Sequence, residues 1–324
     1  MAPKKNIDVL ESSLRSRGEL LNILLIDRTT KNNIKWGTDS YQLKINNNFA
    51  PNKQIKPELV TGKMYGKLIQ PRAAKPMYEQ RKRTKDKAEV FTPLHIVDKM
   101  NKAIDWSSNY PPNKDNWQLY VKQLKLEITC GEAPFIVGRY NPDAHTGNII
   151  QLYTNTGKPN RVGFLDRKLY VVSKYCLKHS EWVKWAKEAY MASYGYEWQG
   201  DNILIARENL LYTFIDFYVD KFKRRPTLKL QEEIAEIISW NIFQMDGLKY
   251  VVPMSCKHID RIIPGELTLF GETPDVIEKD ECEGCKLQNP LKHNGKYVKI
   301  MDWAENKQIR FVDLVVNHSR ESEK

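Results

Sequence analysis

The stretch that decides the fold is Leu126-Glu127-Ile128-Thr129-Cys130-Gly131-Glu132-Ala133-Pro134-Phe135. It predicts a short buried strand, then a tight turn with acidic residues and a glycine, then a further apolar segment. Gly131 has no side chain, so a ligand can approach the backbone closely there. In an open α/β sheet, ligands bind outside the carboxyl ends of the strands. We therefore expect a binding pocket at the end of this strand.

Other segments extend the same pattern. Val90-Phe91-Thr92-Pro93 predicts a helix start, with Thr92 as the N-cap and a proline in the first turn. Tyr194-Gly195-Tyr196-Glu197 predicts a strand that ends on an acid, and Asp246 lies in a predicted turn further on. S-adenosylmethionine needs carboxylates of this kind, because its ribose hydroxyls, ammonium group and adenine amine are all donors.

The net charge of the chain is concentrated in its first quarter. Residues 1–85 hold 18 Lys or Arg against 7 Asp or Glu, which accounts for the whole net charge of +11 of the 324-residue chain. Such a region attracts polyanions, because Lys and Arg neutralise phosphates. The alternative interpretation is a solvated region that keeps the protein soluble. We predict a basic DNA-binding region over residues 1–85 and a second domain over residues 86–324.

The densest group of cations lies between residues 70 and 87. Tyr65 and Tyr78 lie nearby, where they would either stack on bases or pack in a core. The side chains that we expect to contact double-stranded DNA are Arg72, Lys75, Arg81, Lys82, Arg83 and Lys85.

These motifs resemble those of N6-adenine DNA methyltransferases, in particular the modification subunits (subunit M) of restriction systems. Val90-Phe91-Thr92-Pro93 is similar to the family's F-T-P motif, and residues 126–135 are similar to its L-E-P-x-C-G-x-G-x-F motif. Tyr194-Gly195-Tyr196-Glu197 resembles its Y-G-x-E motif, and Ala206-Arg207-Glu208-Asn209-Leu210 resembles the A-R-x-N-L helix that follows. The resemblance covers residues 85–250, roughly half the chain.

The resemblance implies an α/β, Rossmann-like methyltransferase fold that binds S-adenosyl-L-methionine. The residues that it implies for the cofactor site are Phe91, Thr92, Glu127, Gly131, Glu197 and Asp246. The first two would line the methionine end, and Glu127 and Gly131 would lie beneath the amino acid. The last two would bind the ribose and the adenine. Ala133-Pro134 stands where the family usually has a second glycine and a small residue.

The catalytic N-P-P-Y motif of the family is missing from this sequence. In the family, its first residue accepts hydrogen bonds from the target amine, and its aromatic ring stacks on the flipped base. The nearest substitute is Asp302-Trp303, at the end of a strand predicted for residues 297–301. A carboxylate and an indole there would hold an exocyclic amine. The alternative is a surface aspartate beside a packed tryptophan.

The cysteines point to a metal site. Cys282-Glu283-Gly284-Cys285 has the spacing and the glycine of a zinc knuckle, and Cys256-Lys257-His258 offers two more ligands. We therefore expect Cys256, His258, Cys282 and Cys285 to bind a structural Zn²⁺ that stabilises a C-terminal insertion at residues 256–293. His293 follows these residues in the sequence. We predict no regular secondary structure for residues 260–281. The alternative is a set of free thiols in a loop.

The expected function is therefore S-adenosylmethionine-dependent methylation of DNA, on adenine N6, within a bacterial or phage restriction-modification or phage-defence system. A specificity or nuclease subunit is the expected partner. The alternative is a catalytically deficient, methyltransferase-like DNA-binding subunit of a defence complex, and RNA or another amine remains a third substrate class. The sequence has no apolar run of membrane-spanning length. Met1-Ala2-Pro3-Lys4-Lys5 does not start a signal peptide, so we expect a cytoplasmic protein without a membrane partner.

Overall fold

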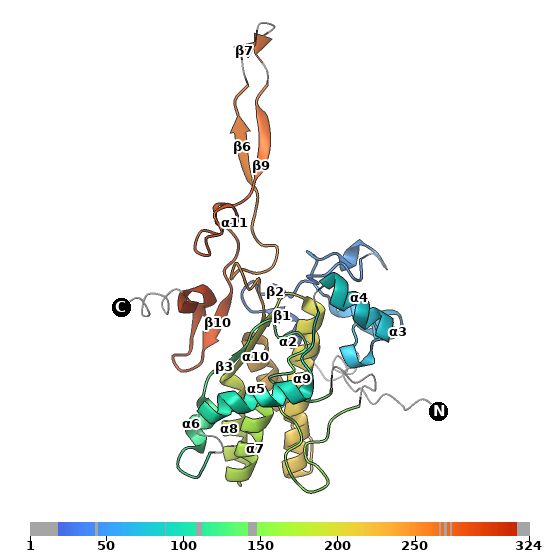
Figure 1. Ribbon diagram of the computed structural model, residues 1–324, viewed down its shortest axis with the longest axis vertical. Helices are drawn as coiled ribbons and strands as arrows, with labels where there is room; N and C mark the ends of the chain where they lie inside the picture. The colour runs from blue at the N-terminus through green and yellow to red at the C-terminus, as the bar shows by residue number, and fades with distance from the viewer. Residues whose placement is uncertain are drawn as a thin grey trace.

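The protein is built around a short parallel sheet with helices packed against it. A computed structural model describes residues 19–42, 45–87, 89–107, 112–141, 148–265, 267–268, 271–272 and 274–315. Figure 1 shows a largely helical body that contains the sheet, and a long hairpin that projects away from that body. Residues 1–18, the start of the predicted basic region, lie outside the described residues.

The sheet consists of β3 (Lys125–Glu127), β4 (Ser193–Glu197) and β5 (Ile242–Gln244), in the order β3-β4-β5. Both pairs are parallel, with Leu126 opposite Tyr194 and Tyr196 opposite Phe243. The carboxyl ends of the three strands therefore meet at one edge. The expected α/β class is confirmed, and within the described residues this sheet has three strands.

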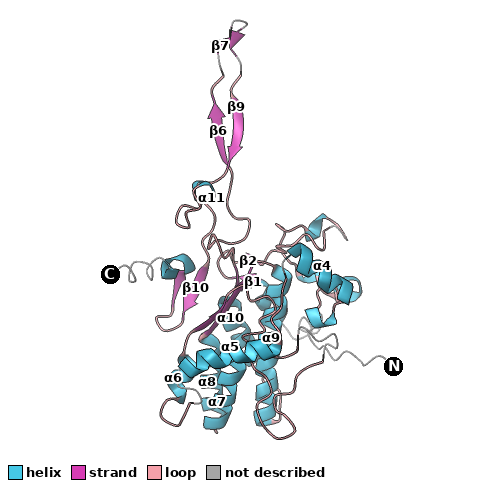
Figure 2. Ribbon diagram, viewed as in Figure 1, coloured by secondary structure: helices cyan, strands magenta, loops and turns pink. Residues whose placement is uncertain are grey.

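Four helices connect these strands. α7 (Phe164–Tyr175) and α8 (His179–Met191) lie between β3 and β4, whereas α9 (Gly200–Phe222) and α10 (Leu228–Asn241) lie between β4 and β5. Figure 2 shows α7 and α8 low in the body of the molecule, whereas α9 and α10 reach the height of the sheet and contact β4 and β5. α9 is apolar around most of its circumference, as expected for a helix enclosed by the core. Its fully or almost fully buried side chains include Ile203, Leu204, Leu210, Leu211 and Phe214.

The N-terminal region packs into the same core. α2 (Leu20–Leu25) contacts α10 and α9, and Trp36 and Phe49 belong to the main apolar cluster. The other elements before the sheet, among the residues that the structure describes, are β1 (Ile26–Asp27), β2 (Asn32–Asn33), α3 (Gly62–Tyr65), α4 (Met77–Lys87), α5 (Leu94–Ser107), α6 (Trp117–Lys122) and three short 3-10 turns, η1 (Asn47–Phe49), η2 (Pro57–Leu59) and η3 (Arg72–Ala74). The domain boundary at residue 85 stays a prediction.

The C-terminal strands form a separate ribbon. β10 (Lys299–Asp302) pairs with β11 (Lys307–Arg310), and the pairing is antiparallel. The strand predicted for residues 297–301 therefore exists in part, but it does not continue the parallel sheet. A four-residue connection favours a hairpin, because it returns the chain directly to the strand that it has just left. Ile300 and Phe311 pack on Tyr196 and Phe243, which covers one face of β4 and β5.

The stretch 260–281, expected to be irregular, is mostly a two-stranded ribbon. β6 (Ile259–Ile263) pairs antiparallel with β9 (Val276–Asp280), and β7 (Leu267–Thr268) pairs with β8 (Gly271–Glu272) nearer the tip. Ile262 stands opposite Ile277, and such β-branched pairs favour strands. A short helix, α11 (Glu283–Lys286), follows at the base of the ribbon.

Candidate functional site

A cavity of about 730 Å³ opens at the carboxyl ends of β3 and β4. Its walls come from the segment after α4, from α5, from the loop after β3 and from the start of α9. The predicted cofactor residues that line it are Phe91, Thr92, Glu127, Gly131 and Glu197. The structure therefore brings together five of the six residues predicted for one ligand.

The loop after β3 has an unusual backbone. Thr129, Gly131 and Ala133 have φ values of 46°, 53° and 64°, so every second residue is left-handed. Side chains other than glycine rarely adopt this conformation, and when they do the strain often marks a functional site. A Cβ atom added to Gly131 would lie 3.2 Å from Cε1 of Phe91, so the close approach of these residues favours glycine. Ala133 has a backbone conformation that glycine favours.

Glu127 lies under this loop with 8% of its surface exposed. Its carboxylate accepts hydrogen bonds from the backbone N–H groups of Ile136 at 3.1 Å and Phe135 at 3.3 Å. Burial raises the pKa of this carboxyl well above its usual value, and the two backbone donors oppose that effect. The nearby charge of Glu197 raises the Glu127 pKa further.

Glu197 ties the end of β4 to the loop after β3. It accepts a hydrogen bond from the Gly131 N–H at 3.0 Å, and others from Trp198 and Gln199 at 2.9 and 3.1 Å. Burial raises its pKa, against the opposing effect of these donors. Neither Glu127 nor Glu197 forms an ion pair with a lysine or arginine in the part of the chain that the structure describes. The cavity thus contains two buried carboxylates that no such cation neutralises.

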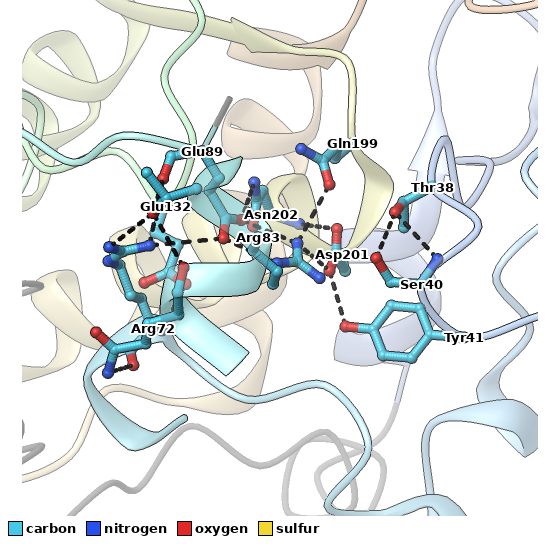
Figure 3. A network of polar contacts seen from close by, with 12 residues as sticks. Thr38, Ser40, Tyr41, Arg72, Arg83, Glu89, Glu132, Gln199, Asp201 and Asn202 are labelled. Atoms are coloured by element: carbon cyan, nitrogen blue, oxygen red, sulfur yellow. Dashed lines mark hydrogen bonds and ion pairs between the residues drawn. The ribbon is translucent and has the colours of Figure 1, made fainter. Parts of the chain in front are cut away.

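A third acid in the cavity, Glu89, has a different environment. Figure 3 shows Glu89 inside a polar network with Arg83, Asp201 and Asn202. Arg83 donates to Glu89 at 2.8 and 2.9 Å and to Asp201 at 2.8 Å, and Asn202 donates to Glu89 at 3.1 Å. Although burial opposes its charge, Asp201 and Glu89 hold the pKa of Arg83 above its usual value. This network joins α4 to the N-terminus of α9 beside the cavity.

The network changes the interpretation of the predicted DNA contacts. Arg83 is 4% exposed and Lys75 is 5% exposed, so both point into the protein. Arg72 is partly buried: its N–H donates to Glu132 at 2.7 Å, and its guanidinium lies 5.1 Å from the ring centre of Phe91. Only Arg81, Lys82 and Lys85 of the six are exposed. Helical spacing explains the split, because Arg83 lies on the opposite side of α4 from these three residues.

Asp246 lies in a different place from the other predicted cofactor residues. It follows β5 and lines a second cavity, of about 220 Å³, which also contains Trp198 and three cysteines. Its carboxylate accepts hydrogen bonds from the N–H groups of Leu248 at 3.0 Å and Lys249 at 3.2 Å. The structure does not bring Asp246 into the larger cavity with Glu197.

Four side chains at the base of the ribbon form a compact cluster that could bind a metal ion: Cys256, Cys282, Cys285 and His293. The Nδ1 atom of His293 lies 3.7 Å from each of the three sulfur atoms, and all four atoms lie within 4.8 Å of one another. Although burial opposes it, hydrogen bonds from the Asn294 backbone and from His293 lower the pKa of Cys282 to about 6. The thiolate is the form that binds metals.

The ligand set differs from the predicted one in one residue. His293 takes the place of His258, which is exposed. The spacing C-x-H favoured His258 along the chain, but the fold brings residues 282–293 back to Cys256. Gly284 is needed for this arrangement, because a Cβ atom there would lie 2.5 Å from the His293 backbone nitrogen.

Asp302 and Trp303, the proposed substitute for the catalytic motif, do not line either cavity. Trp303 donates from Nε1 to Asn241 at 2.8 Å and packs against the main core. Asp302 accepts hydrogen bonds from the N–H groups of Ala304 and Glu305 at 3.1 and 3.2 Å. These contacts suit a hairpin turn and a packed indole, which is the alternative interpretation of the pair.

In the helix motif Ala206-Arg207-Glu208-Asn209-Leu210, Arg207 has a structural role. Arg207 is fully buried and donates to the carbonyl oxygens of Leu24, Ile26, Ser239 and Ile242. One side chain therefore holds α2, α10 and β5 together. Burial lowers its pKa to about 9.

The polar residues of the larger cavity that were missed from the sequence include Glu89, Asn101, Gln199 and Asn202. Gln199 and Asn202 directly follow the Y-G-x-E motif, so their proximity to Glu197 was a usable signal. Asn101 lies in α5, where the pattern gave no sign that it faces a ligand site.

No helix within the described residues is both long enough and apolar enough to cross a membrane. A comparison of the chain with protein-family models, with curated proteins and with solved structures finds no match in any of the three.

Proposed function

We propose that this protein binds S-adenosylmethionine in the 730 Å³ cavity, as a methyltransferase-like protein. One observation carries the proposal: Glu127 and Glu197 are buried in that cavity without a cationic partner among the described residues. Buried charge is costly unless it is paired, so such a site favours a cationic ligand. S-adenosylmethionine has a sulfonium and an ammonium group, together with ribose hydroxyls that a carboxylate accepts well.

The shape of the site is compatible with this ligand. Drug-sized ligands bind in cavities of roughly 300–1,000 Å³ with a few well-placed polar groups. Gly131 keeps the loop after β3 free of a side chain next to Phe91. The ligand would lie at the carboxyl ends of parallel strands, where α/β proteins bind nucleotides.

Calorimetric titration with S-adenosylmethionine tests the proposal. Glu127→Gln and Glu197→Gln should each weaken binding at least about tenfold, which corresponds to about 1.4 kcal/mol. Glu305→Gln is the matched control, because Glu305 is exposed and does not line the cavity, and this variant should bind like the wild type. Equal affinity in all four proteins would refute the assignment of the site.

On the basis of the motif resemblance, we propose that the reaction is methyl transfer to adenine N6 of DNA. Of the six residues predicted to contact DNA, Arg81, Lys82 and Lys85 are the exposed ones that could contact phosphates. The position of Asp302 and Trp303 outside both cavities favours a second candidate, a module that binds the cofactor but does not transfer the methyl group. Base-modification mapping of DNA from cells that express the protein separates the two. Methylated adenine supports transfer, and its absence, together with S-adenosylmethionine binding, supports the module.

We also propose that Cys256, Cys282, Cys285 and His293 bind Zn²⁺. Three thiolates and one imidazole are a typical structural zinc set, and four protein ligands leave no open position for catalysis. The metal would hold the base of the ribbon in place. Metal analysis of the purified protein should find about one equivalent of zinc, and less than about half an equivalent would count against the assignment.

A further inference from the structure

The projecting ribbon is a surface that its own chain leaves uncovered. Residues 258–281 are here called the arm, and their described part leaves the body at the cysteine and histidine cluster and stands clear of the body in Figures 1 and 2. Every described side chain of β6 is exposed, and so are those of β9 up to Lys279. These include Ile262 and Ile277, with 63% and 65% of their surfaces exposed. A lone two-stranded ribbon is marginally stable in water, and exposed apolar side chains of this kind mark interaction surfaces.

The charge of the arm narrows its choice of partner. Residues 258–281 carry seven Asp or Glu and two Lys or Arg. This acidic balance disfavours DNA and also disfavours the arm of a second molecule, because like charges repel. The arm therefore fits a surface that is both basic and partly apolar.

The chain itself has such a surface. The exposed side chains of α3, of α4 and of Lys67 after α3 form a surface here called the basic face: Lys63, Met64, Lys67, Met77, Tyr78, Arg81, Lys82, Lys85 and Asp86. Five of these residues are cations and one is an acid. Met64 and Tyr78 have 81% and 73% of their surfaces exposed. On α4 the exposed residues recur three and four positions apart, so they lie along one side of the helix. Figure 1 shows α4 on the flank of the body, apart from the arm, so the two surfaces do not meet within one molecule.

We propose that the arm of one molecule docks on the basic face of a second copy of this chain. Both the arm and the basic face contain exposed apolar side chains, and the two surfaces have opposite net charges. The opposite charges attract the two surfaces and fix how they align. A reciprocal exchange of arms closes at a dimer. The inference does not depend on cofactor binding. DNA phosphates would contact the same cations, so DNA and the arm are competing anionic ligands of the basic face.

Sedimentation velocity of the full-length, metal-loaded protein tests the proposal. At low salt the wild type should dimerise with rising concentration, and added salt should dissociate the dimer as it screens the charges. Glu278→Lys with Glu281→Lys reverses charge on the arm, and Arg81→Glu with Lys85→Glu reverses it on the basic face. Each pair of substitutions should abolish dimerisation, whereas an equimolar mixture of the two variants should restore a dimer.

All four substituted residues are exposed, so folding should survive, and circular dichroism and metal content check that it does. Lys307→Glu, an exposed charge reversal on β11, is the control and should dimerise like the wild type. A wild type that stays monomeric at every concentration overturns the proposal. The proposal is also overturned if each charge-reversed variant dimerises like the wild type. It is overturned as well if an equimolar mixture of the two variants does not dimerise.

Discussion

Thr129 is the most strained residue of the loop after β3. It is a β-branched residue with a φ of 46°, and its side chain is exposed, so packing does not compensate for the strain. Thr129→Gly should raise the free energy of unfolding by about 1 kcal/mol, because glycine adopts this conformation without a steric penalty. Urea denaturation measures the change. Thr129→Ala keeps the Cβ atom and should therefore give a much smaller gain in the free energy of unfolding. An equal gain in the Gly and Ala variants would mean that backbone strain is not the cause.

Glu132 should make stability depend on pH near neutrality. It is 3% exposed, and burial raises its pKa to about 7 from a usual value of 4.5. The folded state therefore holds this proton more tightly than the unfolded state. The resulting stabilisation is complete below pH 4.5 and is lost as the pH rises through 7.

Glu132→Gln removes this titration. Between pH 4.5 and 8, the free energy of unfolding of the variant should rise by about 3 kcal/mol relative to that of the wild type. Any constant cost of the amide does not change this difference between the two pH values. Denaturation curves at several pH values measure the difference, with Glu305→Gln as the exposed control. A difference that stays constant with pH would contradict the raised pKa.

On α4, substitution of two arginines that lie two positions apart should have very different effects on stability. Arg83 is buried between Glu89 and Asp201, so Arg83→Ala removes the ion pair of the buried Asp201 and leaves Glu89 with Arg72 alone, at 3.8 Å. The substitution should cost about 3–5 kcal/mol in the free energy of unfolding. Arg81 is exposed, and Arg81→Ala should change stability by less than about 0.5 kcal/mol. Thermal and urea denaturation measure both. Similar stability losses in the two variants would refute the division of α4 into inner and outer faces.

At the base of the ribbon, two histidines provide a matched pair. His293→Ala removes a ligand from the cluster and should abolish stoichiometric metal binding. His258→Ala alters an exposed side chain and should leave metal content and melting temperature unchanged. Elemental analysis and thermal denaturation distinguish them. Loss of metal in the His258 variant alone would restore the ligand set expected from spacing.

The parts of the site that local sequence predicts are those fixed by adjacent residues. The turn around Gly131 and the acid at the end of β4 follow from strand and turn patterns, and both reach the cavity. The ligand position of His293 and the ion pair between Arg83 and Asp201 depend on contacts between distant segments, which spacing along the chain does not encode. The same holds for β10, whose apolar pattern predicts a strand but not the partner with which it pairs.

Over the whole molecule, the cavity is assembled from segments far apart in the sequence. Glu89 follows α4, Gly131 follows β3, and Glu197 ends β4. The network of Arg83, Glu89 and Asn202 fixes the first of these segments against α9, as Figure 3 shows. The described part of the basic N-terminal region does not itself line the cavity, but Arg83 holds the lining residue Glu89 in place, so a change in the position of α4 would shift the cavity wall.

The pH dependence of S-adenosylmethionine binding tests the central claim most directly. Glu127 and Glu197 have raised pKa values, and only their charged forms attract a cation. Calorimetry should show that wild-type affinity falls as the pH is lowered through these values and converges on the weaker affinity of Glu127→Gln. The affinity of that variant should depend less on pH. A wild-type affinity that does not change with pH and equals that of the variant throughout would contradict the account.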